Sequence, residues 1–523
     1  MKRKLIALMM SALTVTLMLT GCGGGKDEQP SQGAAEETAA DTQTDTTGAA
    51  DEGTPADAGE EMYQAVLVYI VGQDSQEQDL VSERFNELTR EQLNMEVTLM
   101  PMTFSTWGSQ LPMMLAGGEQ VDLFPMFSTS VPTYMESEYL VDLSPYMDKI
   151  PYIIETVGED GVNCCSINGF LYGIPVMKER TTPAGLIVRT DCLEAAGIDP
   201  QEIKSYDDMT AGYEKVQALY PDMTMFGGSA NGTSVASPGG QTVCFDGLGD
   251  ILGMAALEDY GQTTTVTNYY ESEDFRHKAE LAREWYLAGY IAKDMATCTD
   301  GGETLMKAGN LFSYLTACKP NTKQEKDDQT GYDVTVIQMD KPLVTSVAMN
   351  GITYGVGSGS KDPAKAMELI NWIYETKEAN DLLNWGVEGV HWVEQEDGTA
   401  NFPEGVTMQS CGYHQNMGFI LPNQFNSHVW AGNDSDIFEQ YAQVDESAIR
   451  SLGFGCTTDL RSVTNQLAAV NDVVSQYLAP ITTGAIDPDT AIDEFNQALY
   501  DAGLQDIIDL KQEQLDQWLA EQN

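Results

Sequence analysis

The sequence predicts an α/β protein, built around parallel strands and divided into more than one lobe. Three observations support this prediction. Apolar runs rich in β-branched residues alternate with helical stripes over residues 63–124, an order that implies a parallel sheet with right-handed crossovers. A length of 523 residues exceeds what one hydrophobic core usually organises and suggests two or three lobes. Glycines, bulky apolar residues and a proline at 169–176 suit a strand that crosses between lobes.

The chain opens with the features of a secretory signal. Three cations at residues 2–4 precede an apolar run over 5–19, and small residues lead to Cys22. The run has 15 residues, short of the roughly 20 that a membrane-spanning helix needs, so we predict a signal peptide over 1–21. A short retained membrane anchor is the alternative. Residues 19–22 resemble the bacterial lipoprotein box, in which the cysteine is diacylated and becomes the mature N-terminus.

An acidic linker follows Cys22. Residues 23–61 hold eleven acidic residues and one Lys, and they contain no Val, Ile, Leu, Met or aromatic residue. Such a segment cannot bury enough apolar surface to fold, and its like charges extend it. We therefore predict that residues 22–61 form a lipidated, disordered tether, with an end-to-end distance of roughly 35 Å as a flexible coil.

The folded part begins abruptly after the tether. Residues 65–71 form a continuous apolar run rich in β-branched side chains, which predicts a strand buried on both faces. Ser75 and Gln78 have the spacing of a capping box and predict the start of a helix. Further strands are predicted at 95–100 and 121–124, with a short helix between them that includes Leu111, Met114 and Leu115.

The middle of the chain contains a second set of elements. Apolar residues 186–188 restart a sheet, and acidic and aromatic helical segments fill much of 205–315. Residues 319–331 are predicted to be a polar loop, and strands recur at 333–338 and 353–356.

Helices dominate the predicted C-terminal part. Asp362 and Asp487, each followed by proline, are suitable N-cap residues. The first of these helices should end near residues 384–386, and a last amphipathic helix should cover about 504–519.

The charge balance excludes several partner classes. Lys and Arg number 27 against 80 Asp and Glu, a net charge of −53. This balance argues against nucleic acid and against adsorption to anionic lipid through a basic surface. The 42% hydrophobic content argues against a disordered polyanion.

The cysteines do not indicate a disulfide scaffold or a zinc site. Nine cysteines in 523 residues are too few for such a scaffold. The chain lacks a Cys-x-x-Cys motif and a His pair with ligand spacing. Their pairing is left open, and we expect most of the eight after Cys22 to be buried as small hydrophobic side chains.

Several segments resemble the extracellular solute-binding proteins of ATP-driven importers. Residues 115–123 resemble the stretch before the third strand of that family. Residues 168–176 are similar to its crossover into the second lobe, and 189–198 to a helix that follows.

The later part of the chain is similar to a particular branch of this family, the sugar-type lipoproteins with a C-terminal domain labelled DUF3502. The similarity covers residues 354–367, 380–392 and 452–519. The segment at about 222–330 matches no quoted pattern of the family.

The resemblance implies a two-lobed fold like that of periplasmic binding proteins, with hinge strands between the lobes. Lobe one would combine 62–172 with 345–400, and lobe two 173–344 with 401–523. The lobes would close on a small-molecule solute, a carbohydrate and by expectation an oligosaccharide, and deliver it to the permease subunits of an ABC importer. The resemblance also implies a monomer anchored by lipid at the cell membrane, on its extracellular face, without a cofactor.

The ligand site is expected beyond the carboxyl ends of the strands, as in other open parallel sheets. Sugars need flat apolar surfaces for their C–H faces and planar polar groups for their hydroxyls. The residues predicted to bind the ligand combine these properties: Asp74, Trp107, Ser128, Glu179, Arg180, Trp385, Glu388, His391 and Trp430. Packing is the alternative for each tryptophan, and a structural glycine turn is the alternative for 385–392.

Other residues are predicted to have structural roles. Trp372 and Trp518 lie on helical stripes and should pack in the core, and Asp459 and Arg461 should form a surface ion pair. We also expect Trp385→Ala to weaken ligand binding without lowering the melting temperature of the unliganded protein.

Enzyme motifs are not recognisable. The glycines at 355–359 before Ser360 and Lys361 lack the spacing of a phosphate-binding loop, and no Gly-x-Ser-x-Gly elbow occurs. Asp434 and Asp436 lack the glycine and the final acid of a calcium loop, so we predict no metal and no catalytic residue. Paired carboxylates can be distant in sequence, which keeps a surface-anchored glycan hydrolase as an alternative. A non-transport adhesin or sensor is the third.

Overall fold

The computed structural model describes residues 61–228, 234–236, 244–249 and 254–522. The predicted signal peptide, Cys22 and all of the tether before Glu61 lie outside the described residues. Within the described ranges, no helix combines the length and the apolar character that a membrane crossing requires.

The first group of strands forms a parallel pair and an antiparallel trio. Strand β1 (Tyr63–Val71) pairs in parallel with β2 (Met95–Thr103) through helix α1 (Gln78–Leu93), as predicted. The third strand differs from the prediction. Of the predicted strand at 121–124, only Leu123 makes a parallel bridge to β1. The strand itself, β3 (Phe124–Phe127), pairs antiparallel with β12 (Ile352–Gly355). Strand β6 (Ile174–Pro175) completes this sheet on the other side of β12.

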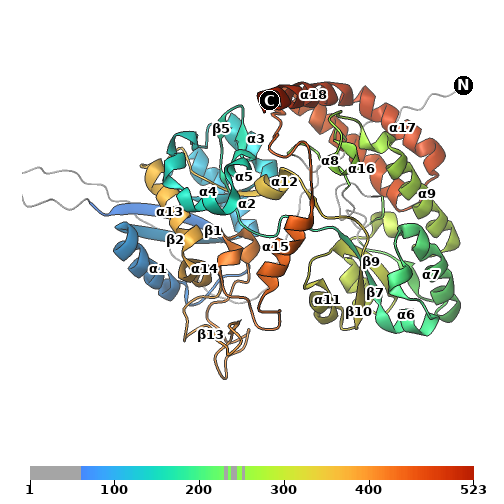
Figure 1. Cartoon of the computed structure of the whole chain (residues 1–523), viewed down its shortest axis with the longest axis horizontal. Helices are drawn as coiled ribbons and strands as arrows, with labels where there is room; N and C mark the ends of the chain where they lie inside the picture. The colour runs from blue at the N-terminus through green and yellow to red at the C-terminus, as the bar shows by residue number, and fades with distance from the viewer. Residues whose placement is uncertain (1–60, 229–233, 237–243, 250–253, 523) are drawn as a thin grey trace, which may run out of the picture. The chain divides into compact units, whose positions relative to one another are not determined.

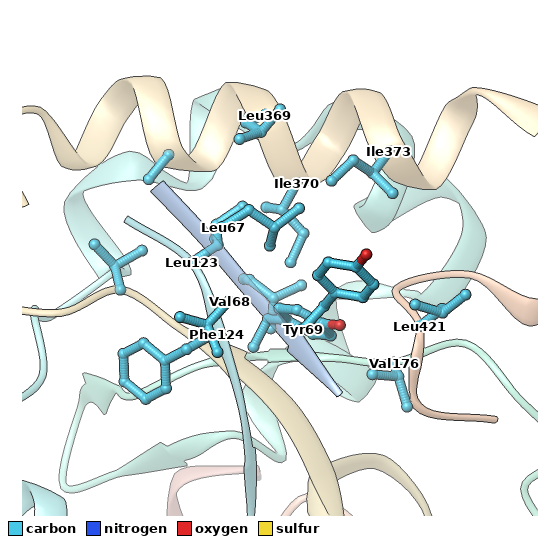
Figure 2. Packing of buried hydrophobic residues seen from close by; sticks show 14 of the residues in the cluster. Leu67, Val68, Tyr69, Leu123, Phe124, Val176, Leu369, Ile370, Ile373 and Leu421 are labelled. Carbon is cyan, nitrogen blue, oxygen red and sulfur yellow. The ribbon is translucent and has the colours of Figure 1, made fainter. Parts of the chain in front are cut away.

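A single hydrophobic core holds this group together. Helix α13 (Pro363–Glu375) packs against β1, and Figure 2 shows its Leu369, Ile370 and Ile373 above Leu67. Leu421, from much later in the chain, belongs to the same core. Full burial of each such side chain contributes roughly 1.5–3 kcal/mol to folding, so these distant segments are joined mainly by apolar contact.

The second group is a four-stranded sheet in the order β10-β7-β9-β8. Figure 1 shows β7, β9 and β10 next to one another, with α6 and α7 nearby. The strands and their helices are β7 (Ala184–Arg189), β8 (Thr224–Phe226), β9 (Leu311–Ala317), β10 (Val334–Gln338), α6 (Thr190–Ala196), α7 (Tyr206–Leu219) and α9 (Glu273–Ala288). Buried Trp285 of α9 packs edge-on against Tyr213 of α7, with ring centroids 4.9 Å apart.

The polar segment at 319–331 is a helix where a loop was predicted. Helix α11 (Thr322–Thr330) has an i,i+4 ion pair between Lys323 and Asp327 at 2.9 Å. Its Lys326 is buried and lies 2.8 Å from Glu303 of α10 (Gly302–Lys307). The first ion pair lies within the helix and the second is tertiary. The helix sequence has no apolar stripe, which is the pattern by which a helix is usually predicted.

Three C-terminal helices and α9 surround another core. They are α16 (Thr464–Thr482), α17 (Pro488–Asp501) and α18 (Leu504–Glu521). The predicted caps at Asp362 and Asp487 are confirmed, since both side chains accept hydrogen bonds from backbone N–H groups of the first helical turn. The helix after Asp362 is broken at Thr376 and continues as α14 (Lys377–Asn384).

The start of helix α1 differs from the prediction. The capping box at Ser75 is wrong, because Ser75 Oγ accepts a hydrogen bond from Gln415 Nε2 and α1 begins without a side-chain cap. The eight described cysteines are free thiols, and four of them are fully buried: Cys164, Cys165, Cys192 and Cys456.

The remaining elements are short, except for α2 and α15. They are α2 (Phe104–Ala116), α3 (Val131–Glu136), α4 (Pro151–Val157), α5 (Glu159–Asn163), β4 (Ser166–Ile167), β5 (Phe170–Leu171), α8 (Glu258–Gly261), β11 (Leu343–Val344), α12 (Val347–Asn350), β13 (Val393–Glu394), β14 (Ala400–Asn401), α15 (Ile437–Ser447) and β15 (Ile449–Arg450).

Candidate ligand-binding site

A pocket of about 600 Å³ lies between segments that are far apart in the sequence. One side is formed by residues 319–321 and α11, and another by 384–385, 416–433 and α15. Its aromatic lining consists of Trp385, Phe419, His428, Trp430, Phe438 and Tyr441. Its polar lining includes Glu179, Lys319, Asn321, Gln324, Glu325, Asp328, Gln329, Asn384, Asn416, Gln424, Ser427 and Asn433.

Two tryptophans form an aromatic wall of this pocket. The ring centroids of Trp385 and Trp430 are 4.8 Å apart, and His414 packs behind them at 5.1 Å and 4.4 Å from the respective rings. Trp385 is only 4% exposed and donates its Nε1 hydrogen to the carbonyl of His428 at 3.0 Å. The wall is therefore held in place before any ligand arrives.

Below this wall, a buried carboxylate orients the His428 segment. Asp381 of α14 accepts hydrogen bonds from the His428 backbone N–H, at 2.7 Å, and contacts His428 Nδ1, also at 2.7 Å. The Asp381 side chain is 4% exposed, so both contacts are shielded from water. This anchoring couples α14 to the loop that carries Trp430.

Two polar residues of the pocket come from adjacent hydrogen-bonded segments. Met177 N donates to the Pro422 carbonyl at 2.8 Å, and Gln424 N donates to the Met177 carbonyl at 2.9 Å. This short ladder brings Glu179 and Gln424 to the same pocket. Among the described residues, neither Glu179 Oε2 nor Gln424 Oε1 has a hydrogen-bond partner, although both atoms are buried.

The opposite side of the pocket is linked to α15 by polar contacts. Asn321 donates to Asn433 at 2.9 Å and accepts the hydroxyl hydrogen of Tyr441 at 2.8 Å. Burial raises the pKa of Tyr441, and the nearby carboxylates of Glu179 and Glu325 raise that pKa further. Tyr441 therefore stays neutral at physiological pH.

The structure brings three of the nine predicted residues to this pocket: Glu179, Trp385 and Trp430. Ser128 lines a second, mostly apolar pocket of about 350 Å³, together with Asn350 and Arg461. Trp107 lies within α2, donates to the Pro125 carbonyl at 3.0 Å and packs edge-on against Phe127.

The other predicted residues lie elsewhere. Asp74 is exposed, and Glu388 is exposed at a separate surface hollow. His391 is 1% exposed, with Nδ1 accepting from Val387 N at 2.8 Å and Nε2 lying 3.0 Å from Glu77. The backbone N–H of Arg180 donates to Asp445 at 3.0 Å.

Trp372 is buried against Phe85, and Trp518 packs on the C-terminal core. Arg461 and Asp459 form the predicted ion pair at 2.7 Å.

Sequence reasoning missed the residues contributed by α11 and by the segment before it. Lys319, Asn321 and Glu325 lie in the stretch that matched no family pattern and was predicted to be a loop. Gln424 was also missed, although the cluster of Asn423, Asn426 and His428 near Trp430 was a usable signal.

The pocket has the chemistry of a binding site for a polyhydroxylated ligand. Its aromatic faces suit C–H surfaces, and its amides and carboxylates suit hydroxyl groups. Over the described ranges, no group of three or more His, Cys, Asp or Glu side chains is arranged to hold a metal ion.

Comparison with protein families gives two matches. Residues 71–380, more than half of the chain, match the family described as bacterial extracellular solute-binding protein. Residues 451–520 match the domain of unknown function DUF3502.

Individual proteins are similar over most of the chain. A carbohydrate ABC transporter substrate-binding protein of Streptococcus pneumoniae serotype 4 (strain ATCC BAA-334 / TIGR4) is 21% identical over 89% of this chain and 92% of its own. The crystal structure of the N-glycan transport solute binding protein of S. pneumoniae has a TM-score of 0.75 at 18% identity, covering 88% of this chain and 100% of that one. The same protein in complex with Man5GlcNAc has a TM-score of 0.65 at 19% identity, covering 88% and 99%. These likenesses establish the two-lobed fold of solute-binding proteins for this chain.

Proposed function

Because this chain belongs to the bacterial extracellular solute-binding protein family, we propose that it captures a carbohydrate outside the cell and delivers it to the permease subunits of an ABC importer. It is a binding protein and not an enzyme, so the hydrolase alternative is not retained. The observation that carries the proposal is the pocket walled by Trp385 and Trp430 and lined by amides and carboxylates. A volume of about 600 Å³ lies within the range of small-molecule sites, roughly 300–1,000 Å³.

An oligosaccharide is the ligand class that we favour. The similar S. pneumoniae protein is named for N-glycan transport and was solved with Man5GlcNAc. The present pocket draws its lining from at least four segments, which supports contacts to more than one sugar unit.

Ligand capture is proposed to occur by hinge closure between two lobes. We assign 62–172 and 345 to about 421 to lobe one and the rest of the folded chain to lobe two. The boundary lies beyond the predicted residue 400 because Tyr413 and Leu421 pack in the same core as Val68. We further propose that the protein is monomeric and held at the membrane by lipid on Cys22.

Isothermal titration calorimetry of the full-length protein against a panel of neutral and acidic oligosaccharides tests the proposal, with a parallel assay for reaction products. We expect saturable binding of at least one glycan without its conversion. Cleavage of a bound glycan would contradict the transport function, and failure of the entire panel to bind would contradict the carbohydrate assignment.

A further inference from the structure

Two buried acceptor atoms in the polar lining of the pocket restrict the kind of carbohydrate that the proposed function can involve. Glu179 Oε2 and Gln424 Oε1 are acceptors, buried and without a partner among the described residues. A buried acceptor without a donor is costly, and a ligand hydroxyl or amide N–H would remove that cost. The pocket therefore calls for donors at this position.

The position of Glu179 keeps this acceptor available. Its side chain is 11% exposed, and the backbone ladder between Met177 and Gln424 fixes the segment that carries it. Lys178 Nζ donates to the Glu179 carbonyl at 3.2 Å and lies 3.9 Å from Oε1, which leaves Oε2 for a ligand.

The charge of the lining is negative. Three carboxylates line the pocket, those of Glu179, Glu325 and Asp328, and the lining contains one ammonium group, that of Lys319. The Lys178 ammonium lies outside the lining and compensates Glu179 only in part, at 3.9 Å from Oε1. Lys319 Nζ lies 3.7 Å from Glu325, so part of its charge is already compensated inside the protein. The His428 imidazole is likewise paired, with Asp381.

We propose that this pocket selects uncharged glycans and rejects glycans that carry a carboxylate, such as uronic or sialic acids. The inference rests on the proposed carbohydrate function. A ligand carboxylate beside Glu179 would present acceptors where donors are needed and would meet a like charge in a partly desolvated site. A neutral sugar of the same shape would instead donate hydroxyl hydrogens to Glu179 and Gln424 while a ring face packs on the tryptophan wall.

Matched pairs of glycans test this selectivity by calorimetry with the full-length protein. Suitable pairs are cellotriose with cellotriuronic acid, mannotriose with mannuronate trisaccharide, and the methyl ester of 3′-sialyllactose with 3′-sialyllactose itself. We expect the acidic member of any pair that binds to be weaker by about tenfold or more at low salt. The difference should shrink as NaCl rises from about 10 mM to about 500 mM, because salt screens the repulsion.

Glu179→Gln removes the negative charge at nearly constant size. It should reduce the difference in affinity between the neutral and the acidic member of a pair. Glu439→Gln, an exposed position on α15 outside the pocket lining, should leave it unchanged. Acidic members that bind as tightly as their neutral partners would overturn the charge selectivity and leave the carbohydrate function standing. If no member of any pair binds, the carbohydrate function itself fails. Should Glu179→Gln not fold, the salt series on the unaltered protein decides the question.

Discussion

At the scale of single residues, Trp385 illustrates how burial changes an expectation. Its place after a helix, in a stretch rich in glycine and aromatic residues, identified it as a ligand contact. The structure adds that the ring is 4% exposed and packs against both Trp430 and His414. The sequence pattern around Trp385 cannot predict this burial, because Trp430 and His414 lie 29 or more residues away in the chain. Trp385 therefore contributes to both stability and the pocket.

Trp385→Ala is now expected to lower stability as well as affinity. Removal of a buried tryptophan typically costs about 3–5 kcal/mol of unfolding free energy. Trp430 is only partly buried, so Trp430→Ala should cost less stability while weakening glycan binding by ~2 kcal/mol, as for central aromatic contacts. Urea unfolding and calorimetry on both variants check this, with Trp430→Phe as a control that keeps an aromatic face. An unchanged affinity in Trp430→Ala would remove Trp430 from the ligand contacts.

His414 provides a prediction of pH dependence. Burial lowers the pKa of His414 from its ordinary value of 6.5 to about 4. Between these values the unfolded chain binds a proton that the folded protein does not, so stability falls as the pH drops from 6.5 to about 4. The expected contribution is about 3 kcal/mol across that window.

His414→Phe should remove this part of the acid sensitivity. The measurement is chemical unfolding of both proteins at several pH values between 4 and 7, and the stability difference between them should change with pH. The slope of the unaltered protein is the reference for this comparison. Identical slopes for the two proteins would contradict a neutral, buried His414.

Among the helices and strands, the sequence predicted those features that depend on residues close together in the chain. The apolar run at 65–71, the crossover through α1 and the caps at Asp362 and Asp487 were all predictable. The antiparallel pairing of β3 with β12 joins strands more than 200 residues apart and leaves no local trace.

Helix α11 was missed for a related reason, since it is held by ion pairs and a buried lysine and not by an apolar stripe. Because α11 forms one side of the pocket, the failure to predict this segment also left about half of the polar lining residues unpredicted. The candidate site was therefore predictable on its aromatic side and not on the side facing it.

The Asp362 cap allows a direct test of one element. Its carboxylate accepts hydrogen bonds from the backbone N–H groups of Ala364, at 3.1 Å, and Lys365, at 3.3 Å. Asp362→Ala should lower the unfolding free energy by about 1 kcal/mol, the usual value of an N-cap. Urea denaturation measures the change, and Lys361→Ala at the neighbouring exposed position should be close to neutral. Equal stability of the two variants would show that α13 does not depend on this cap.

At the scale of the whole molecule, the net charge of −53 divides into parts with different roles. The predicted signal contains three cations, the tether carries ten net negative charges, and residues 62–523 carry −46. A charge of this size favours solubility and repels anionic surfaces. It acts in the same direction as the negative pocket lining, since acidic glycans would be repelled before they reach the site.

The proposed location at the membrane depends on the proposed lipid on Cys22, because a chain of this charge does not adsorb to anionic lipid through its surface. Two acyl chains give stable anchoring, whereas electrostatic adsorption to anionic lipid is unfavourable here. Cys22→Ala should therefore shift the protein from the membrane fraction to the culture medium, with unchanged affinity for glycans. Fractionation followed by immunoblotting measures the shift, and Cys411→Ala, in the folded part, should remain with the membrane. Retention of Cys22→Ala in the membrane fraction would indicate that another segment, such as an uncleaved N-terminus, anchors the chain.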